Sequence, residues 1–288
     1  MRNGVVGLGL AVALVALAAC GGGSSGTKVE DELGFTPEGT LSRQAKIETL
    51  IRDCMKAQGF EYVPVDPVAQ RTALTGQTGF NDAEFNKVYG YGITTLYEQR
   101  LNIPADPNAA IKNRLSSADQ AAYSKALSGE FADETFAVAA ESGDYSRLGG
   151  CTRQATDTAF GSADVLQNLV GKLDELDQRI VADRRMQSAI AKWSDCMHAV
   201  GYDLAEPEQV DVLLQRRLDA IVGPANSRRT DYDKAALAAL QHDEVAMVAS
   251  DTDCEKKNIQ KVEDVVRAEY EKAFREENAA LLGTVVKP

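Results

Sequence analysis

Four cysteines lie beyond the apolar N-terminus of this 288-residue chain, and two of them begin copies of one short pattern. The pattern is Cys-Met-x-x-x-Gly followed by an aromatic residue and an acid, and it occurs over residues 54–61 and again over 196–203. In both copies the glycine follows an amphipathic stretch, which is typical of the position just after a helix ends. The repeat therefore predicts two helical units, each with a cysteine close to the end of a helix.

Each copy is followed by one further cysteine that has a basic residue two positions later. The simplest hypothesis is a duplicated unit with an internal disulfide in each half, Cys54–Cys151 and Cys196–Cys254. Pairings across the halves are the alternative. Zinc binding is not expected, because zinc ligands usually come in pairs two to four residues apart and these cysteines form no C-x-x-C. An even number of cysteines then indicates export to an oxidising compartment.

The N-terminal residues also indicate export. Arg2 precedes an uncharged apolar run over residues 5–19, which is short for a membrane-spanning helix of about 20 residues and typical of a signal peptide. The run ends in Leu-Ala-Ala before Cys20, the spacing of a lipobox, in which the cysteine is lipidated and becomes the new N-terminus. Residues 1–19 are thus predicted to be a lipoprotein signal peptide, and residues 20–41, which start with a Gly/Ser run, a flexible tether. An ordinary secretory signal cut after Ala19 is the alternative.

The chain is acidic, with 43 Asp and Glu against 31 Lys and Arg and a formal charge of −12. This charge argues against nucleic acid as a partner. Removal of residues 1–19 takes away only one charged residue, Arg2, so the mature chain carries −13. Such a body is repelled by anionic lipid, and its membrane contact is expected through the acyl chains on Cys20.

The lipobox, the twin Cys-Met-x-x-x-Gly-aromatic segments and the acidic, Ala-rich run toward the later cysteines resemble uncharacterised exported lipoproteins of actinobacteria. The similarity of pattern covers most of residues 46–275. The stretch Tyr-Gly-Tyr-Gly-Ile-Thr-Thr over residues 89–95 looks similar to a Gly/aromatic stretch in such proteins. The resemblance implies a location and an architecture, and it implies no catalytic residue and no cofactor.

No segment alternates apolar and polar residues over the length of a strand, so a mostly α fold is expected: a disulfide-stapled helical body built from two related halves joined by a long helix. Residues 42–162 are predicted to form the first half, with an insertion, and residues 163–288 the linking helix and the second half. Apolar residues three and four apart predict that the linking helix is continuous from about 163 to 199. Other helices are expected over 42–58, 82–89, 94–101, 118–127, 133–141, 208–222, 232–249 and 259–282, with irregular structure over 61–80.

Residues 76–97 concentrate rings and glycines in a chain with only 6% aromatic residues. Two interpretations are open. In one, Phe80, Tyr89, Tyr91 and Tyr97 form a binding surface for a peptide, glycan or protein partner. In the other, which we prefer, the rings fill the core of the insertion while the glycines allow tight turns.

We expect no catalytic, cofactor-binding or metal-binding residues. No nucleophile and orienting acid can be named for His198. Residues 242–244 (His-Asp-Glu) are neighbours that point apart on a helix, so a solvated face is expected there. The acid pairs at 231/233 and 251/253 lack the ligand pattern of an EF-hand calcium loop.

The function expected is that of a lipid-anchored extracytoplasmic protein on the outer face of the cell membrane. It is predicted to be a non-catalytic binding or structural module with an envelope protein or glycan as partner. A solute-binding lipoprotein of a transporter is one alternative, although such proteins alternate strands and helices. An envelope hydrolase that uses acids or His198 is the other.

Overall fold

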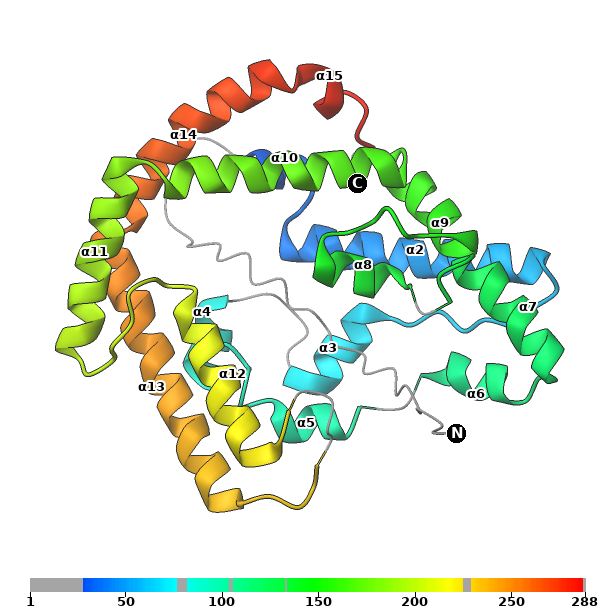
Figure 1. Ribbon diagram of the computed structural model, residues 1–288, viewed down its shortest axis with the longest axis horizontal. Helices are drawn as coiled ribbons and strands as arrows, with labels where there is room; N and C mark the ends of the chain where they lie inside the picture. The colour runs from blue at the N-terminus through cyan, green and yellow to red at the C-terminus, as the bar shows by residue number, and fades with distance from the viewer. Residues whose placement is uncertain (1–27, 77–81, 104–105, 133, 225–228, 287–288) are drawn as a thin grey trace.

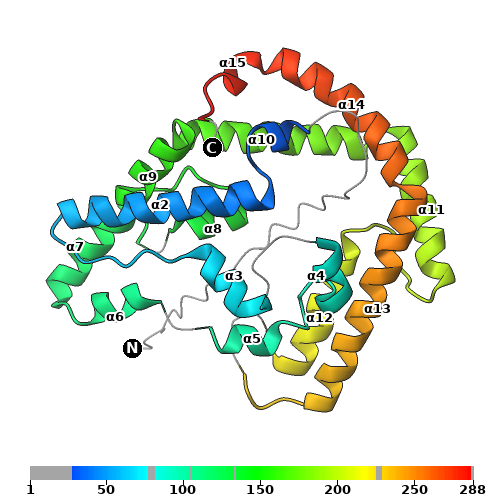
Figure 2. The ribbon, with the colours of Figure 1, turned by 180° about the vertical axis from the view of Figure 1, so that it is seen from behind.

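A computed structural model describes residues 28–76, 82–103, 106–132, 134–224 and 229–286. Every regular element in these ranges is a helix, so the predicted all-α fold is confirmed. The helices are α1 (Val29–Glu32), α2 (Pro37–Ala57), α3 (Pro67–Thr75), α4 (Asp82–Tyr89), α5 (Tyr97–Leu101), α6 (Pro107–Asn113), α7 (Ser117–Ser128), α8 (Phe136–Ser142), α9 (Gly150–Phe160), α10 (Ala163–Val181), α11 (Arg184–Ala199), α12 (Gln209–Val222), α13 (Lys234–Asn258), α14 (Gln260–Glu277) and α15 (Ala279–Leu282). Figures 1 and 2 show α10 and α14 along one side of the body, with α2, α7 and α9 toward one end and α11 to α13 at the other.

The two disulfides join the pairs of cysteines that the repeat predicted. Cys54–Cys151 links the end of α2 to the start of α9, and residues before α2 meet the far end of α9, so the two helices are antiparallel. Cys196–Cys254 links the end of α11 to α13, while Arg185 at the start of α11 pairs with α14. Each bridge therefore closes a long stretch of chain across an antiparallel helix contact.

The twin Cys-Met segments end their helices in the same way. The backbone N–H of the ring residue donates to the carbonyl of the buried methionine, Phe60 to Met55 at 2.9 Å and Tyr202 to Met197 at 3.0 Å. The glycine before each ring has a positive φ, +85° in the first copy and +98° in the second, which residues with a Cβ rarely adopt. The shared pattern thus specifies a helix C-cap with its cysteine facing a partner helix.

The core consists of two clusters of buried side chains that meet within α10. The first cluster collects residues of α2 and α7 to α9 and includes Leu166 of α10. The second begins at Leu169, one turn later, and collects residues of α11 to α14. The helix α10 therefore contributes to both clusters along its length.

The linking helix was predicted to be continuous over residues 163–199, and this prediction is wrong because two separate helices occupy that range. The helix α10 ends at Val181, and α11 begins at Arg184. Between them Asp183 acts as the N-cap of α11, because its carboxylate accepts a hydrogen bond from the backbone N–H of Arg185 at 2.7 Å. Figure 1 shows α10 and α11 meeting at a corner, so the apolar stripe changes direction at this aspartate.

Residues 28–41 are folded, so they are not part of a flexible tether as predicted for 20–41. In α1, Val29 is 1% exposed and belongs to the second cluster, as does Leu33 just after it. Two acids of α1 form ion pairs with arginines of α14. Glu32 lies 2.8 Å from Arg275, and Glu30 lies 3.9 Å from Arg267. The chain is thus fixed to the body from its first described turn.

Three helices begin with a proline, and the sequence prediction missed two of them and started the third late. Pro37, Pro67 and Pro107 occupy the first turn of α2, α3 and α6, each after a capping threonine or aspartate. The helix α2 consequently starts before residue 42, and α3 occupies part of the stretch 61–80 that was expected to be irregular. The helix α9 was also missed, α13 continues past residue 249 to Asn258, and α4 has the predicted bounds.

Candidate functional site

The Gly/aromatic segment between α4 and α5 packs against the second half of the chain. Tyr91, Ile93 and Tyr97 contact the second hydrophobic cluster, and α4 lies along α13. Figure 2 shows α4 and α5 beside α12 and α13. Residues 90–97 therefore fill the core of the second half, whereas the preferred prediction placed them in the core of the first-half insertion.

Glu244 of α13 holds this segment in place. Its side chain is completely buried, and its carboxylate accepts hydrogen bonds from the backbone N–H groups of Ile93, Thr94 and Thr95 at 2.8–3.0 Å. The hydroxyl of Thr94 donates to the same carboxylate. Burial of a charge is costly unless hydrogen bonds compensate it, and four donors do so here. We call this contact between residues 90–97 and α13 the carboxylate joint.

The approach of the segment to α13 depends on a glycine. Gly90 has φ +60°, and a Cβ at this position would lie 2.7 Å from Cγ of Glu244. Any larger residue would therefore need both a strained backbone and a displaced carboxylate. On the outer side of the segment, Arg100 donates to the carbonyls of Gly92 and Ile93, so both polar edges of the backbone are bonded.

Asp251, two turns after the joint glutamate on the same face of α13, makes a second buried contact. Only 1% of it is exposed, and its carboxylate accepts from the indole N–H of Trp193 at 2.8 Å and from the hydroxyl of Tyr91. Burial raises the pKa of Asp251, and the two hydrogen bonds oppose that shift. Burial and the neighbouring carboxylate also raise the pKa of Tyr91, so the phenol stays protonated and donates. This aspartate thus connects α11, α13 and the Gly/aromatic segment.

The other predicted rings are also bonded inside the protein. Tyr89 donates its hydroxyl to the carbonyl of Thr75, and Tyr97 donates to that of Arg229, both at 2.7 Å. Neither ring is fully exposed. Phe80 lies outside the described residues, as does the lipidation candidate Cys20.

The remaining predicted positions fall into exposed and buried groups. His198 and His242 are exposed. The expectation of a solvated face over residues 242–244 is wrong for Glu244, because the carboxylate points inward at the joint. Of the acid pair 251/253, Asp251 is buried, whereas Asp253 forms an ion pair with Lys257.

The spacing of α13 contains a signal that identifies both buried acids. Apart from Val248, its buried residues recur in steps of three and four at positions 237, 240, 244, 247, 251 and 254. Leucine, methionine and cysteine occupy the other positions of this stripe, so Glu244 and Asp251 interrupt an otherwise apolar face. Acids at such positions require partners from a neighbouring segment.

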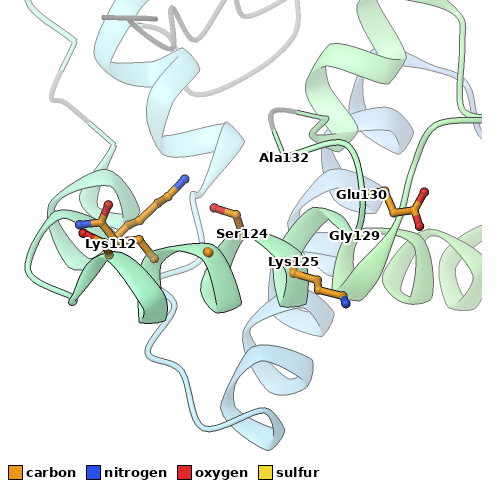
Figure 3. A pocket seen from close by; sticks show the side chains of 9 residues that line it. Lys112, Ser124, Lys125, Gly129, Glu130 and Ala132 are labelled. Atoms are coloured by element: carbon orange, nitrogen blue, oxygen red, sulfur yellow. The ribbon is translucent and has the colours of Figure 1, made fainter. Parts of the chain in front are cut away.

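A separate hollow lies on the surface formed by α6, α7 and the residues after α7 (Figure 3). It is open, with a volume of about 640 Å³, and its lining combines polar and apolar surface in similar amounts. The lining residues are Lys112, Ser117, Gln120, Ala121, Ser124, Lys125, Gly129, Glu130 and Ala132. Figure 3 shows Lys112 and Ser124 directed toward the same space, while Lys125 points away from them. The hollow thus presents ammonium, hydroxyl, amide and carboxylate groups.

Across the described ranges, no three His, Cys, Asp or Glu side chains are grouped so that they could hold a metal ion. In the same part of the chain, none of the helices has the length and apolar character needed to cross a membrane. No protein-family model, no curated protein and no solved structure matches this chain.

Proposed function

We propose that this chain is a lipid-anchored protein of the outer face of the cell membrane and acts there as a non-catalytic binding or structural module. One observation carries the proposal: the helix α1, which is packed on the body, begins at Val29, nine residues after the lipobox cysteine Cys20. The intervening sequence starts with a Gly/Ser run, which is typical of a spacer between an anchor and a folded domain. The distance in sequence is that of a short membrane tether.

The two disulfides support a location outside the cytoplasm. Cys54–Cys151 and Cys196–Cys254 close loops of 97 and 58 residues, and such bridges persist in oxidising compartments. The buried acids support a structural use of the core. Glu244 and Asp251 are fully engaged in holding the Gly/aromatic segment, so we assign ligand contact to the surface.

The hollow on α6 and α7 is the surface that we propose for contact with an envelope component. Its lysines and hydroxyls suit a polar ligand with acidic or hydroxyl groups, such as a glycan. The chain as a whole is acidic, whereas Lys112 is directed into the hollow, whose lining has one acid, Glu130.

The anchor is tested by replacing Cys20 with Ala and separating membrane and soluble fractions. We expect the variant to leave the membrane, because the lipid is the proposed attachment. A matched change in the same tether, Ser24→Ala, should leave the protein in the membrane fraction. Retention of the Cys20→Ala variant would overturn the proposed anchor.

The contact surface is tested by chemical crosslinking of the lipidated protein in its own membranes, followed by purification and mass spectrometry. A Lys112→Glu variant should lose the crosslinked envelope component, because the substitution reverses a charge in the hollow. A Lys272→Glu variant on the exposed surface of α14 is the matched control and should keep it. Equal recovery by both variants would remove the hollow from the proposal.

A further inference from the structure

The docking of α1 limits how far the body can stand from the membrane. The inference rests on the proposed lipid on Cys20. Seven residues lie between this cysteine and Lys28, so the chain takes eight residue steps from one to the other. A chain spans at most about 3.5 Å per residue, so the two points lie within about 28 Å of each other. For a flexible chain of this length the root-mean-square distance is about 16 Å.

The tether leaves the body at a fixed point, because several contacts hold the residues that follow it. Beyond the buried α1 residues and their ion pairs with α14, the guanidinium of Arg43 donates to the carbonyl of Leu33 at 2.5 Å and to that of Val286 at 3.1 Å. The same group lies against the rings of Phe35 and Phe160 and is 4% exposed. The point where the tether joins the body therefore lies on the side that carries α10 and α14.

The opposite end of the body is out of the tether's reach. The helix α13 has 25 residues and is about 38 Å long at 1.5 Å per residue. Figures 1 and 2 show it extending from the corner with α14 to the far end, where its first turn lies near α5. A body placed with that end on the membrane would hold α1 higher than the tether permits. We propose that the face formed by α1, α10 and α14 is directed toward the membrane, and that the end with α5 and the start of α13 points away.

The chemistry of this face indicates that it rests near lipid without adhering to it. The helices α10 and α14 carry ten acidic and six basic residues. Anionic headgroups repel such a surface, so a leaflet of zwitterionic lipid is the partner that it fits. The outward end is then the part of the body that an envelope partner meets first.

The cysteines make a direct measurement practical, because the four described ones are in disulfides and Cys20 carries the proposed lipid. An introduced cysteine is then the single free thiol for a fluorescent donor. Asn168→Cys places it on an exposed position of α10, and Ala238→Cys on an exposed position near the start of α13. The full-length lipidated protein is inserted into phosphatidylcholine vesicles that contain an acceptor on their headgroups.

We expect energy transfer from position 168 to exceed that from position 238 by about twofold or more, since the tether is shorter than α13. Insertion of about 24 Gly/Ser residues between Gly26 and Thr27 raises the root-mean-square tether length to about 31 Å and should reduce the difference. Equal transfer from the two positions with the native tether, or greater transfer from position 238, would overturn the orientation.

Failure of the anchor is distinguishable from failure of the orientation. Flotation of the vesicles shows whether the lipidated protein binds them, which tests the proposed function. A variant with a hexahistidine sequence in place of Cys20, bound to nickel-chelating lipid, repeats the transfer measurement without the native lipid. A difference between positions 168 and 238 in that variant supports the orientation, and no difference overturns it.

Discussion

The two Cys-Met helices end in the same cap but are stabilised by different cores. Around α2 and α9 the core is mainly aliphatic and aromatic, and the ring of Phe160 is stacked against two other phenylalanines and the buried guanidinium of Arg43. Around α11 and α13 it contains two buried carboxylates. The position three residues before the cysteine shows the contrast, because it is Ile51 in the first copy and Trp193, bonded to Asp251, in the second. A shared cap therefore fixes how a helix ends without fixing what it packs against.

The two cores also differ in where their contacts come from along the chain. The first bridge lies among side chains of residues 35–170, which are the first half and its immediate flanks. The second half depends on residues 90–97, which supply the hydrogen-bond donors that its buried acids require. The first half thus supplies part of the core of the second.

Removal of the disulfides should have the largest effect and separates the two halves most directly. In the loop-entropy model, a double change of Cys54 and Cys151 to Ala costs about 4.7 kcal/mol of unfolding free energy, and the same change of Cys196 and Cys254 about 4.2 kcal/mol. The first costs more because its loop has 97 residues against 58. Urea denaturation monitored by circular dichroism measures both. A larger loss from the second pair would show that the native contacts around it outweigh loop length.

The next largest effect is expected at the carboxylate joint. Glu244→Gln replaces one carboxylate oxygen by an NH₂ group, which faces the backbone donors of residues 93–95. The substitution should lower the unfolding free energy by about 3 kcal/mol, since hydrogen bonds to a charged acceptor are worth about 1.5–3 kcal/mol. Residues 90–97 should become sensitive to proteolysis at the same time. The exposed Glu276→Gln on α14 is the matched control and should change stability by less than about 0.5 kcal/mol. A Glu244→Gln protein as stable as this control would contradict the joint.

A smaller effect is expected at the position that distinguishes the two copies. Trp193→Phe keeps most of the ring but leaves Asp251 with one donor, and it should cost about 2 kcal/mol. Its counterpart Ile51→Leu conserves volume and should cost less than about 1.5 kcal/mol. A double-mutant cycle of Trp193→Phe with Asp251→Asn should give a coupling of about 1 kcal/mol. Strictly additive effects would show that the hydrogen bond contributes nothing.

The smallest effect is a pH dependence that involves the second half. The pKa of Asp251 is raised above its ordinary value of 3.8, mainly by burial, so the folded state binds this proton more tightly than the unfolded chain. The stabilisation from this proton is complete below pH 3.8 and is lost as the pH rises through the folded-state pKa. Asp251→Asn should therefore make the unfolding free energy fall less between acidic and neutral pH. Denaturation curves at several pH values measure this slope, and an unchanged slope would refute the assignment.

Several features of the fold follow from local sequence. The cap of the Cys-Met pattern depends on a glycine and a buried methionine that are adjacent in sequence, and the bounds of α4 also follow from local signals. The helices α3 and α6 were missed although their signal is local. Asp66 and Asp106 each precede a proline and accept backbone N–H bonds, which is typical of a helix start. Irregular structure was predicted over residues 61–80, and no helix was predicted over 107–113.

Other features depend on contacts between distant residues. An aspartate such as Asp183 is compatible both with an N-cap and with the exposed face of a continuous helix. Here α11 packs against α14, which favours the N-cap and the change of direction. The carboxylate joint brings residue 94 to residue 244, and no spacing in the sequence specifies that pairing. The stripe on α13 predicts that Glu244 needs donors, but the segment that provides them is known only from the fold.

The two disulfides also determine how the molecule would respond to mechanical force. A pull between the tether and the C-terminal side passes along the backbone to Cys54, crosses the bond to Cys151, and later crosses from Cys196 to Cys254. Residues 55–150 and 197–253 lie outside this load path and cannot be stretched while the bonds are intact. The hollow and both sides of the carboxylate joint are within these unloaded loops, so tension applied between α1 and the C-terminal helices extends other parts of the chain and leaves these regions unextended.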